Sequence, residues 1–420
     1  MKLGYKRLGN YIQLVDERNK NLEVTNLLGI SVTKNFIPSV ANIIGTDMAN
    51  YKIVRKNQFA CSVMQVRRDK KMPVALYLEN KPSIISQAYP VFEIIDETLL
   101  LPEYLMMWFT RSEFDREACF LAVGGVRGSL EWEDFLNMEL PIPSPEKQKE
   151  MIEEYETIEN RIQLNKKLCA TLEETAQTIY KHWFEDFEFP DENGKPYKSS
   201  GGEMAKCEEL GKEIPKAFKL YKISELIENS LGGDWGKDVE TGNYTEKVIC
   251  VRGADINLMK YGNFDNAPIR YIIKKNLSSR NLQKNNIVIE LSGGSPTQST
   301  GRSLQISEKL INEIRTNLIC SNFCRALQMK DGYSDIVFAK INFEYDRDTF
   351  FRYENSSHGV KNLNIGDLFN DLMIATNESF LNEFSQNINV IKDKILTLGI
   401  QNQKLEELKS LLLGKMAVEN

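Results

Sequence analysis

Residues 145–189 read PEKQKEMIEEYETIENRIQLNKKLCATLEETAQTIYKHWFEDFEF, and this stretch decides the fold. Seam residues recur along it at alternating spacings of three and four, which is the a/d pattern of a coiled coil. The seam positions are Tyr155, Ile158, Ile162, Asn165, Cys169, Leu172, Ala176, Ile179 and Trp183. Because an isolated helix cannot bury its own apolar stripe, the pattern predicts a long helix that needs a partner.

The C-terminal segment supplies the predicted partner. Its seam positions are Phe384, Ile388, Ile391, Ile395, Leu398, Asn402, Leu405 and Leu412, with Lys409 as the one weak position. Each seam contains an asparagine, Asn165 and Asn402, and an asparagine in a seam commonly fixes the register of a coiled coil at some cost in stability. The alternative interpretation is two unrelated amphipathic helices that pack on separate cores.

An internal repeat relates the two halves of the chain. Three pairs of segments recur in the same order: 56–57 and 284–285, 125–127 and 359–361, and 172–174 and 405–407. A common order and a nearly constant offset indicate a duplication. The repeat predicts an α+β chain in which two mixed α/β domains, residues 1–144 and 193–376, alternate with two long helical segments, residues 145–192 and 377–420. If these helices form an antiparallel coiled coil, the two domains are related by a pseudo-twofold axis.

Within the domains, short runs of β-branched and aromatic residues predict the strands. We expect strands within 51–66, 74–78 and 89–95 and a helix over 102–114 in the first domain. In the second domain we expect strands at 248–251, 269–273, 287–291 and 318–327. A basic turn at 67–71 and a small, polar loop at 292–303 interrupt these runs.

Composition limits the class of protein. Of the 420 residues, 42% are hydrophobic and 27% charged, and no apolar run or leader predicts a membrane span or secretion, so we expect a cytoplasmic protein. The seven cysteines form no C-x-x-C pair and there are two histidines, which argues against a zinc site. The net charge of −6 does not exclude DNA binding, because residues 145–192 hold 13 acidic and 6 basic residues and a local basic surface is sufficient.

Sequence motifs for catalysis are missing. A base-flipping amino-methyltransferase needs a loop such as Asn-Pro-Pro-Tyr, and this chain has no adjacent prolines. The segment from Gly294 to Ser303 fails as a phosphate-binding loop, because six residues separate its glycines and Arg302 replaces the lysine. Pro190-Asp191 has no nearby acid-x-Lys partner, and neither histidine lies near a nucleophile motif. We therefore predict no catalytic residue and no metal site.

Several strings resemble the specificity subunits of type I restriction-modification systems. They are residues 140–143 (LPIP), 145–148 (PEKQ), Asn165 with Leu172-Glu173, and 179–187 (IYKHWFEDF). Together with the alternation of domains and helices, the resemblance covers essentially the whole chain. It departs from the family pattern at Lys147, where an acidic residue is usual, and in the second helix, which lacks the proline-led entry and the Trp-Phe-x-Asp-Phe run.

The resemblance implies sequence-specific DNA recognition without catalysis. Each domain would be a target-recognition domain that binds one half of a split site in double-stranded DNA, and the coiled coil would set the gap between the halves. The expected partners are methyltransferase (M) subunits, two in number, and restriction/translocase (R) subunits. S-adenosylmethionine, ATP and Mg²⁺ would belong to these partners, with no cofactor in this chain. The alternative is a two-headed coiled-coil adaptor that binds proteins and not DNA.

Candidate contact residues follow from residue type and position. Arginine and lysine neutralise phosphates, while arginine, asparagine, glutamine and serine on loops can bind base edges. The candidates for DNA are Arg67, Arg68, Lys70, Lys71, Arg127, Arg280, Lys284, Ser295, Gln298, Arg302 and Lys361. Arg127 and Lys361 also fit structural turns beside glycines. The candidates for partner docking are His182, Trp183, Phe184 and Phe187, for which internal packing is the alternative.

Overall fold

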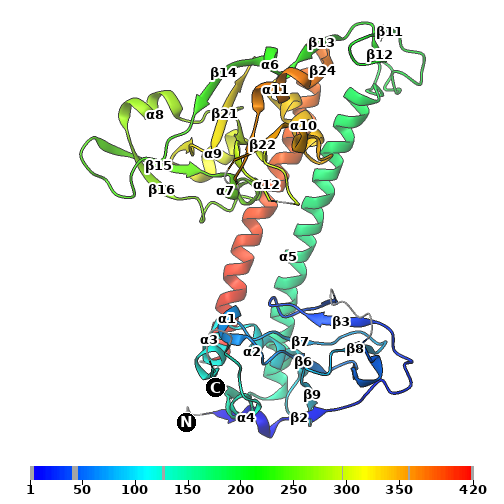
Figure 1. The fold of residues 1–420 in the computed structure, drawn as a ribbon, viewed down its shortest axis with the longest axis vertical. Helices are drawn as coiled ribbons and strands as arrows, with labels where there is room; N and C mark the ends of the chain where they lie inside the picture. Colours follow the sequence, from blue (N-terminus) through cyan, green and yellow to red (C-terminus); the bar gives the residue numbers. More distant parts are fainter. Residues whose placement is uncertain (1–3, 40–45, 125–127, 296, 358–359, 418–420) are drawn as a thin grey trace. The chain divides into compact units, whose positions relative to one another are not determined.

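The computed structural model describes the chain except for residues 1–3, 40–45, 125–127, 296, 358–359 and 418–420. It divides into two compact units. Unit 1 comprises residues 1–162 and 405–420, and unit 2 comprises residues 163–404. Each unit therefore contains part of both long helices, α5 (Pro145–Tyr180) and α12 (Glu378–Lys415) (Figure 1). The four predicted segments divide the chain differently, and their boundaries stay a prediction.

Unit 1 contains two four-stranded sheets. The first has the order β2 (Ile12–Val15), β9 (Val91–Ile94), β6 (Phe59–Cys61), β7 (Val74–Leu76), and all of its pairs are antiparallel. The second has the order β4 (Phe36–Pro38), β3 (Leu27–Ile30), β8 (Ser83–Ile85), β5 (Lys52–Val54), with β3 and β8 parallel. The other elements are β1 (Tyr5–Arg7) paired with β10 (Glu139–Pro141), η1 (Leu8–Asn10), η2 (Met48–Asn50), α1 (Val66–Asp69), α2 (Pro102–Thr110), α3 (Ser112–Leu121) and α4 (Trp132–Asn137).

Unit 2 is built in the same way. Its four-stranded antiparallel sheet has the order β14 (Ile227–Gly232), β21 (Cys324–Met329), β17 (Ile287–Glu290), β19 (Ser303–Gln305). A second sheet has the order β16 (Ile269–Ile273), β15 (Tyr244–Val251), β20 (Asn317–Cys320), with β15 and β20 parallel. Three smaller strand sets are β13 (Lys219–Lys222) with β24 (Met373–Thr376), β11 (Met204–Cys207) with β12 (Lys212–Pro215), and β18 (Ser292–Gly293), β23 (Val360–Leu363) and β22 (Glu354–Ser357). The helices are η3 (Lys181–Glu185), α6 (Ile223–Leu226), α7 (Gly253–Lys260), α8 (Lys274–Arg280), α9 (Glu308–Ile314), α10 (Ser334–Tyr345), η4 (Thr349–Tyr353) and α11 (Ile365–Asp371).

The two units share a topology. In the sheets β2-β9-β6-β7 and β14-β21-β17-β19 the strands lie in the order first, fourth, second, third along the chain. Both units also contain one parallel pair, β3 with β8 and β15 with β20, which is flanked by an antiparallel strand. A shared strand order of this kind supports the duplication that the sequence repeat predicts.

One repeated dipeptide marks an equivalent turn. Asn57 precedes β6 and Asn285 precedes β17, and both have left-handed backbones, with φ of 67° and 69°. The next side chains, Gln58 and Asn286, each accept a hydrogen bond at 2.8 Å from the backbone N–H three residues before them. Asparagine tolerates positive φ better than most residues, so its recurrence here has a local structural cause.

The antiparallel coiled coil predicted from the heptads is confirmed. In unit 2, Asn165 Nδ2 donates to Asn402 Oδ1 at 2.9 Å, and Cys169 packs with Ile395 and Leu398. The numbers rise along α5 as they fall along α12, which is the signature of antiparallel helices.

The same seam continues inside unit 1. Ile158 and Ile162 pack against Leu412. Lys409, the weak seam position, donates to Glu159 at 3.0 Å, so its charge is neutralised across the helix pair. The apolar seam of α5 therefore packs against α12 in both units.

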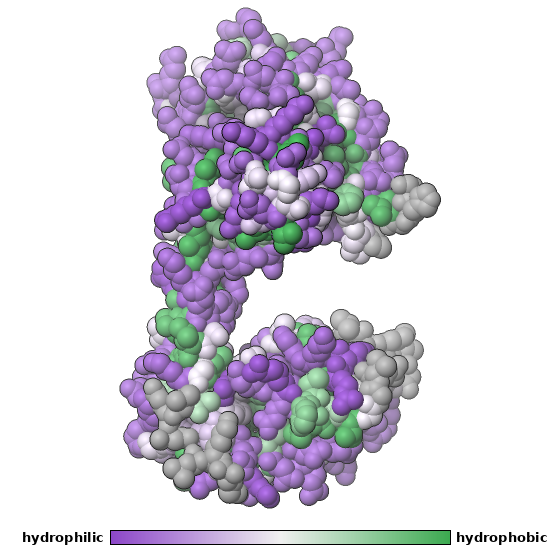
Figure 2. Space-filling model, turned by 90° about the vertical axis from the view of Figure 1, so that its left-hand side faces the viewer, coloured by the Kyte–Doolittle hydropathy of each residue, from purple (hydrophilic) through white to green (hydrophobic). Residues whose placement is uncertain are grey.

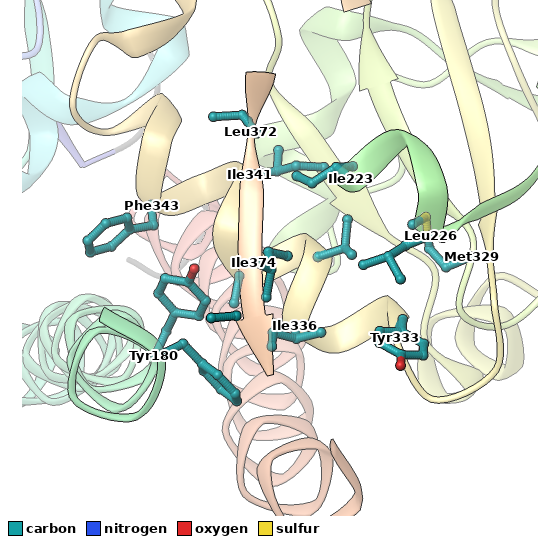
Figure 3. Packing of buried hydrophobic residues seen from close by; sticks show 14 of the residues in the cluster. Tyr180, Ile223, Leu226, Met329, Tyr333, Ile336, Ile341, Phe343, Leu372 and Ile374 are labelled. Carbon is teal, nitrogen blue, oxygen red and sulfur yellow. The ribbon is translucent and has the colours of Figure 1, made fainter. Parts of the chain in front are cut away.

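The seam of unit 2 leads directly into its core. Tyr180, at the end of α5, is fully buried and lies 5.1 Å from the ring of Phe343 on α10. Figure 3 shows Tyr180 facing this ring, with Ile374 of β24 and Ile223 of α6 in the same cluster. The end of α5 is thus part of the hydrophobic core of unit 2.

Four details differ from the sequence predictions. The predicted helix over 102–114 is two helices, because Arg111 is extended, with ψ of 140°. The strand predicted over 318–327 is interrupted between β20 and β21 by a turn at 321–323. The basic segment predicted as a turn contains α1. The helical run predicted to residue 189 ends earlier, since η3 stops at Glu185 and Phe187 has φ of 59°.

Among the described residues, no helix combines the length and apolar character needed to cross a membrane.

The Asn165–Asn402 contact makes a testable prediction. Replacing Asn165 by leucine removes the donor to a seam amide, and we expect the free energy of unfolding to fall by about 1–3 kcal/mol. The double variant Asn165→Leu, Asn402→Leu should recover most of this loss, because two apolar groups can pack in the seam. Thermal unfolding of the full chain measures both. Equal losses in the single and double variants would contradict a specific amide contact, and Leu164→Ala at an exposed α5 position is the control.

Candidate nucleic-acid interface

Three loops meet at one edge of the four-stranded sheet in unit 2. Strands β14 and β17 end there, and β19 and β21 begin there, as the pairs Gly232–Arg325 and Ile289–Ser303 show. The segments 233–236, 291–295, 297–302 and 321–323 therefore lie together, and we call them the loop edge of unit 2. Backbone hydrogen bonds join them, since Leu291 N–H donates to Phe323 O at 2.8 Å.

Unit 1 has the equivalent loop edge. Strands β2 and β6 end there, and β7 and β9 begin there, as the pairs Val15–Val91 and Cys61–Val74 show. The segments 16–18, 62–73 and 86–90 form this loop edge of unit 1. Its longest segment connects β6 to β7, and in unit 2 the equivalent connection from β17 to β19 is residues 291–302.

Most of the predicted DNA contacts fall in these two equivalent connections. The β6–β7 connection carries Arg67, Arg68, Lys70 and Lys71, and the β17–β19 connection carries Ser295, Gln298 and Arg302. Because candidates chosen separately in the two halves occupy one topological position, the duplicated fold presents two comparable surfaces.

The basic connection of unit 1 contains both structural and exposed cations. Arg67 donates to Ala122 O at 2.5 Å and packs against Gly128. A Cβ added at Gly128 would lie 2.6 Å from the Cβ of Arg67. Arg68 pairs with Asp69 at 2.7 Å. Lys70 and Lys71 are exposed. The lysines are therefore better placed to contact a phosphate than Arg67, which braces a glycine turn.

A buried ion pair fixes the end of this connection. Asp115 accepts from the backbone N–H of Met72 at 3.1 Å and from Lys34 Nζ at 2.7 Å. Lys34 also donates to Phe109 O at 2.5 Å. Burial lowers the pKa of Lys34, while the Asp115 carboxylate raises it in part. Neither residue stands out in the sequence, because they are 81 positions apart and only the fold brings them together.

In unit 2, two predicted cations are held by carboxylates. Arg302 makes two hydrogen bonds to Glu290, at 2.5 and 2.9 Å, and the Glu290 side chain is only 2% exposed. Lys361 pairs with Glu354 at 2.8 Å. A buried carboxylate needs such a partner, so these cations hold the loop in shape.

The remaining candidates of unit 2 divide between the loop edge and elsewhere. Gln298 is exposed and its carbonyl accepts from Ser295 N–H at 2.8 Å, which closes a tight turn. Arg280 reaches the loop edge from α8 and donates to Gly233 O at 2.8 Å. Lys284 lies before β17, at the opposite end of that strand, and pairs with Glu308. The structure thus does not bring Lys284 to the loop edge, and Arg127 lies outside the described residues.

The predicted partner-docking run is largely inside unit 2. Trp183, Phe184 and Phe187 are at most 7% exposed and belong to its core. Phe184 packs edge-on against Phe384 at 5.0 Å. His182 is exposed. The geometry favours the alternative of internal packing for the three aromatic residues, and docking at His182 stays a prediction.

Gln148 has a role that the sequence interpretation did not assign. It belongs to the PEKQ string at the start of α5 and is completely buried. Its Oε1 accepts from Leu101 N–H at 2.8 Å, and its Nε2 donates to Leu99 O at 2.8 Å and Pro143 O at 2.9 Å. Gln148 thereby joins the start of α5 to the loop between β9 and α2. In the sequence, only its place in the PEKQ string distinguishes Gln148 from other polar residues of the helix.

Metal ligands and thiols can be assessed in the described residues. Among them, no cluster of His, Cys, Asp and Glu could hold a metal ion. Burial raises the pKa of Cys320 to about 11 and that of Cys324 to about 12, so these thiols stay protonated at neutral pH.

Comparisons with known proteins agree with one another. Residues 68–174 match the family described as type I restriction modification DNA specificity domain. The MjaIX specificity subunit from Methanocaldococcus jannaschii is 22% identical over 340 residues, which cover 77% of this chain and 70% of that protein. The HindI specificity subunit from Haemophilus influenzae is 24% identical over 139 residues, or 33% and 30% of the two chains.

A solved structure has a similar fold. The S subunit of a type I restriction-modification system from M. genitalium superposes with a TM-score of 0.55 and 12% identity, covering 99% of this chain and 96% of that chain. The α+β architecture predicted from the repeat is therefore confirmed.

The contacts of Gln148 lead to a prediction. Replacing it by leucine leaves the buried Leu101 N–H and two carbonyls without partners, and we expect the free energy of unfolding to fall by about 1–3 kcal/mol. Chemical denaturation of the full chain measures the change. Lys149→Leu, at the adjacent exposed position, is the matched control and should be nearly neutral. A neutral Gln148→Leu variant would refute the anchoring role.

Proposed function

We propose, from its similarity to the type I restriction-modification specificity subunits, that this chain supplies DNA sequence recognition to a larger complex and catalyses no reaction itself. The observation that supports this most directly is the placement of the candidate contacts in the equivalent β6–β7 and β17–β19 connections. A protein with two comparable recognition surfaces suits a target with two separate parts.

In this proposal each unit binds one half of a split site in double-stranded DNA. Exposed lysines such as Lys70 and Lys71 contact phosphates and orient the unit, while Gln298 and neighbouring small polar side chains contact base edges. The paired helices α5 and α12 set the unspecified gap between the two halves. Unlike the β6–β7 connection of unit 1, the β17–β19 connection of unit 2 has no run of basic residues, so the two units contact phosphates differently.

The chemistry belongs to partner subunits in this proposal. Methyltransferase subunits, two per complex, modify adenine with S-adenosylmethionine, and restriction/translocase subunits use ATP and Mg²⁺. In this proposal the complex acts on DNA in the cytoplasm. The two-headed protein adaptor is the competing class, and it differs in having no affinity for DNA.

Methylome sequencing tests the function. The gene is transferred with its partner genes into a host without this system, and the methylated motif is determined. We expect one motif made of two defined halves separated by a gap, and a motif in a single block would exclude the split-site proposal. No new methylation, although the partner subunits assemble, would favour the adaptor.

The exposed lysines of unit 1 provide a sharper prediction. In the assembled complex, Lys70→Ala with Lys71→Ala should lower the slope of log affinity against log salt by about 0.9 for each lost phosphate contact. The methylated motif should stay the same, because phosphates carry no direct sequence information. Lys206→Ala, an exposed lysine on the β11–β12 hairpin, is the control. An unchanged slope in the double variant would remove this connection from the DNA surface.

A further inference from the structure

Two large aromatic side chains are exposed at the loop edge of unit 2. Trp235 follows β14 and is 39% exposed, and Phe323 precedes β21 and is 64% exposed. The surface seen in Figure 2 is mainly hydrophilic with separate hydrophobic groups. Exposed aromatic rings cost free energy in water, so a pair on adjacent turns needs an explanation.

The Trp235 ring is held in place by a buried arginine. The Arg270 guanidinium lies 4.3 Å from the ring centroid. Arg270 is only 5% exposed, donates to Trp235 O at 2.7 Å and pairs with Asp238. With the guanidinium against the indole, the ring is fixed before any ligand arrives.

Glycines fix the backbone that presents Trp235. A Cβ on Gly233 would lie 1.9 Å from Ser321 O. Gly236 has φ of +57°, and a Cβ there would lie 2.3 Å from Tyr271 O. No other residue fits these positions without moving the backbone, so the loop has one shape.

The turn that carries Phe323 is equally constrained. Phe323 O accepts from Leu291 N–H at 2.8 Å and from Ser292 N–H at 3.3 Å. Asp234 N–H donates to Cys320 O at 2.9 Å, which ties this turn to the Trp235 loop. Both rings therefore project from a rigid part of the loop edge.

The charges around the rings favour a polyanion. Four acidic side chains at or near the loop edge have a basic partner: Asp234 with Arg280, Asp238 with Arg270, Glu290 with Arg302, and Glu354 with Lys361. Lys237 and Arg325 add positive charge that no acid in this set balances. Aromatic faces surrounded by excess positive charge suit nucleobases on a phosphate backbone better than an apolar protein surface.

Unit 1 lacks this pair. Counted from the equivalent turns at Asn57 and Asn285, the pair Phe59–Phe92 corresponds to Ile287–Leu327. By this register Ala88 occupies the position of Phe323. The segment equivalent to the Trp235 loop begins Asp16-Glu17-Arg18. The aromatic pair is thus specific to unit 2 and is not a requirement of the shared fold.

We infer that Trp235 and Phe323 contact nucleobases at a distorted or unstacked step within the half-site that unit 2 binds. The inference rests on the proposed function and deepens it. Apolar side chains inserted at a base step, or stacked on an exposed base, add affinity without adding charge. This contact would make recognition by unit 2 depend on how easily its half-site unstacks, in addition to hydrogen bonds with base edges.

The test uses the complex assembled with its methyltransferase subunits and a duplex carrying the methylated motif. Trp235→Ala and Phe323→Ala should each weaken specific binding by about 5- to 150-fold, with the salt slope unchanged because no charge is lost. Trp235→Phe should retain most of the affinity, which separates loss of stacking from loss of folding. Leu78→Ala is the matched control. Leu78 is 57% exposed and follows β7 at the end away from the loop edge of unit 1, so this variant should bind DNA with unchanged affinity.

Base analogues locate the contact. 2-Aminopurine placed along each half-site should change fluorescence on binding at a step in the unit 2 half, and this change should be lost in Phe323→Ala. Unchanged affinity in both alanine variants, while the unchanged complex binds specifically, would overturn the inference and leave the proposed function standing. Loss of methyltransferase assembly with unchanged DNA affinity would identify a protein contact and also overturn it. Absence of specific binding by the unchanged complex would defeat the proposed function itself.

Discussion

The antiparallel seam of α5 and α12 is the interaction on which both compact units depend. Unit 1 is completed by residues 405–420, whose seam residue Leu412 packs on Ile158 and Ile162. Unit 2 contains the Asn165–Asn402 contact, and its core continues from the seam through Tyr180. Because each unit contains parts of both helices, its core forms only when segments far apart in the chain have paired.

The fold decides how each basic residue can be used. Arg302 and Arg67 are strong candidates by type and position, but one neutralises buried Glu290 and the other braces Gly128. Lys70 and Lys71 are left exposed. Arg302 is held in place by the cost of leaving Glu290 unpaired. Arg67 is exposed, but its bond to Ala122 O holds it in place, so the partners of a cation decide its use as much as its burial does.

Local patterns predicted what local forces control. The heptads predicted the helix pair, since a seam repeats every seven residues. Runs of β-branched and aromatic residues located β6, β7 and β9 in unit 1 and β15, β16 and β17 in unit 2, whereas β2, β3, β4 and β14 were not predicted. The breaks were harder to predict, because Arg111 and the turn at 321–323 interrupt apolar runs without a glycine or proline to mark them. At Phe187 the helical run was predicted to continue, but the backbone turns with φ of 59°.

By itself, the sequence determined the two long helices, their pairing, the duplication and the family resemblance, because periodicity and repetition are properties of the order of residues. Only the tertiary structure decided that Trp183 and Phe184 are buried, that Asp115 and Lys34 pair, and that Trp235 and Phe323 stay exposed on adjacent turns. Burial and pairing depend on neighbours brought from distant positions by the sheets, and no local pattern records those neighbours.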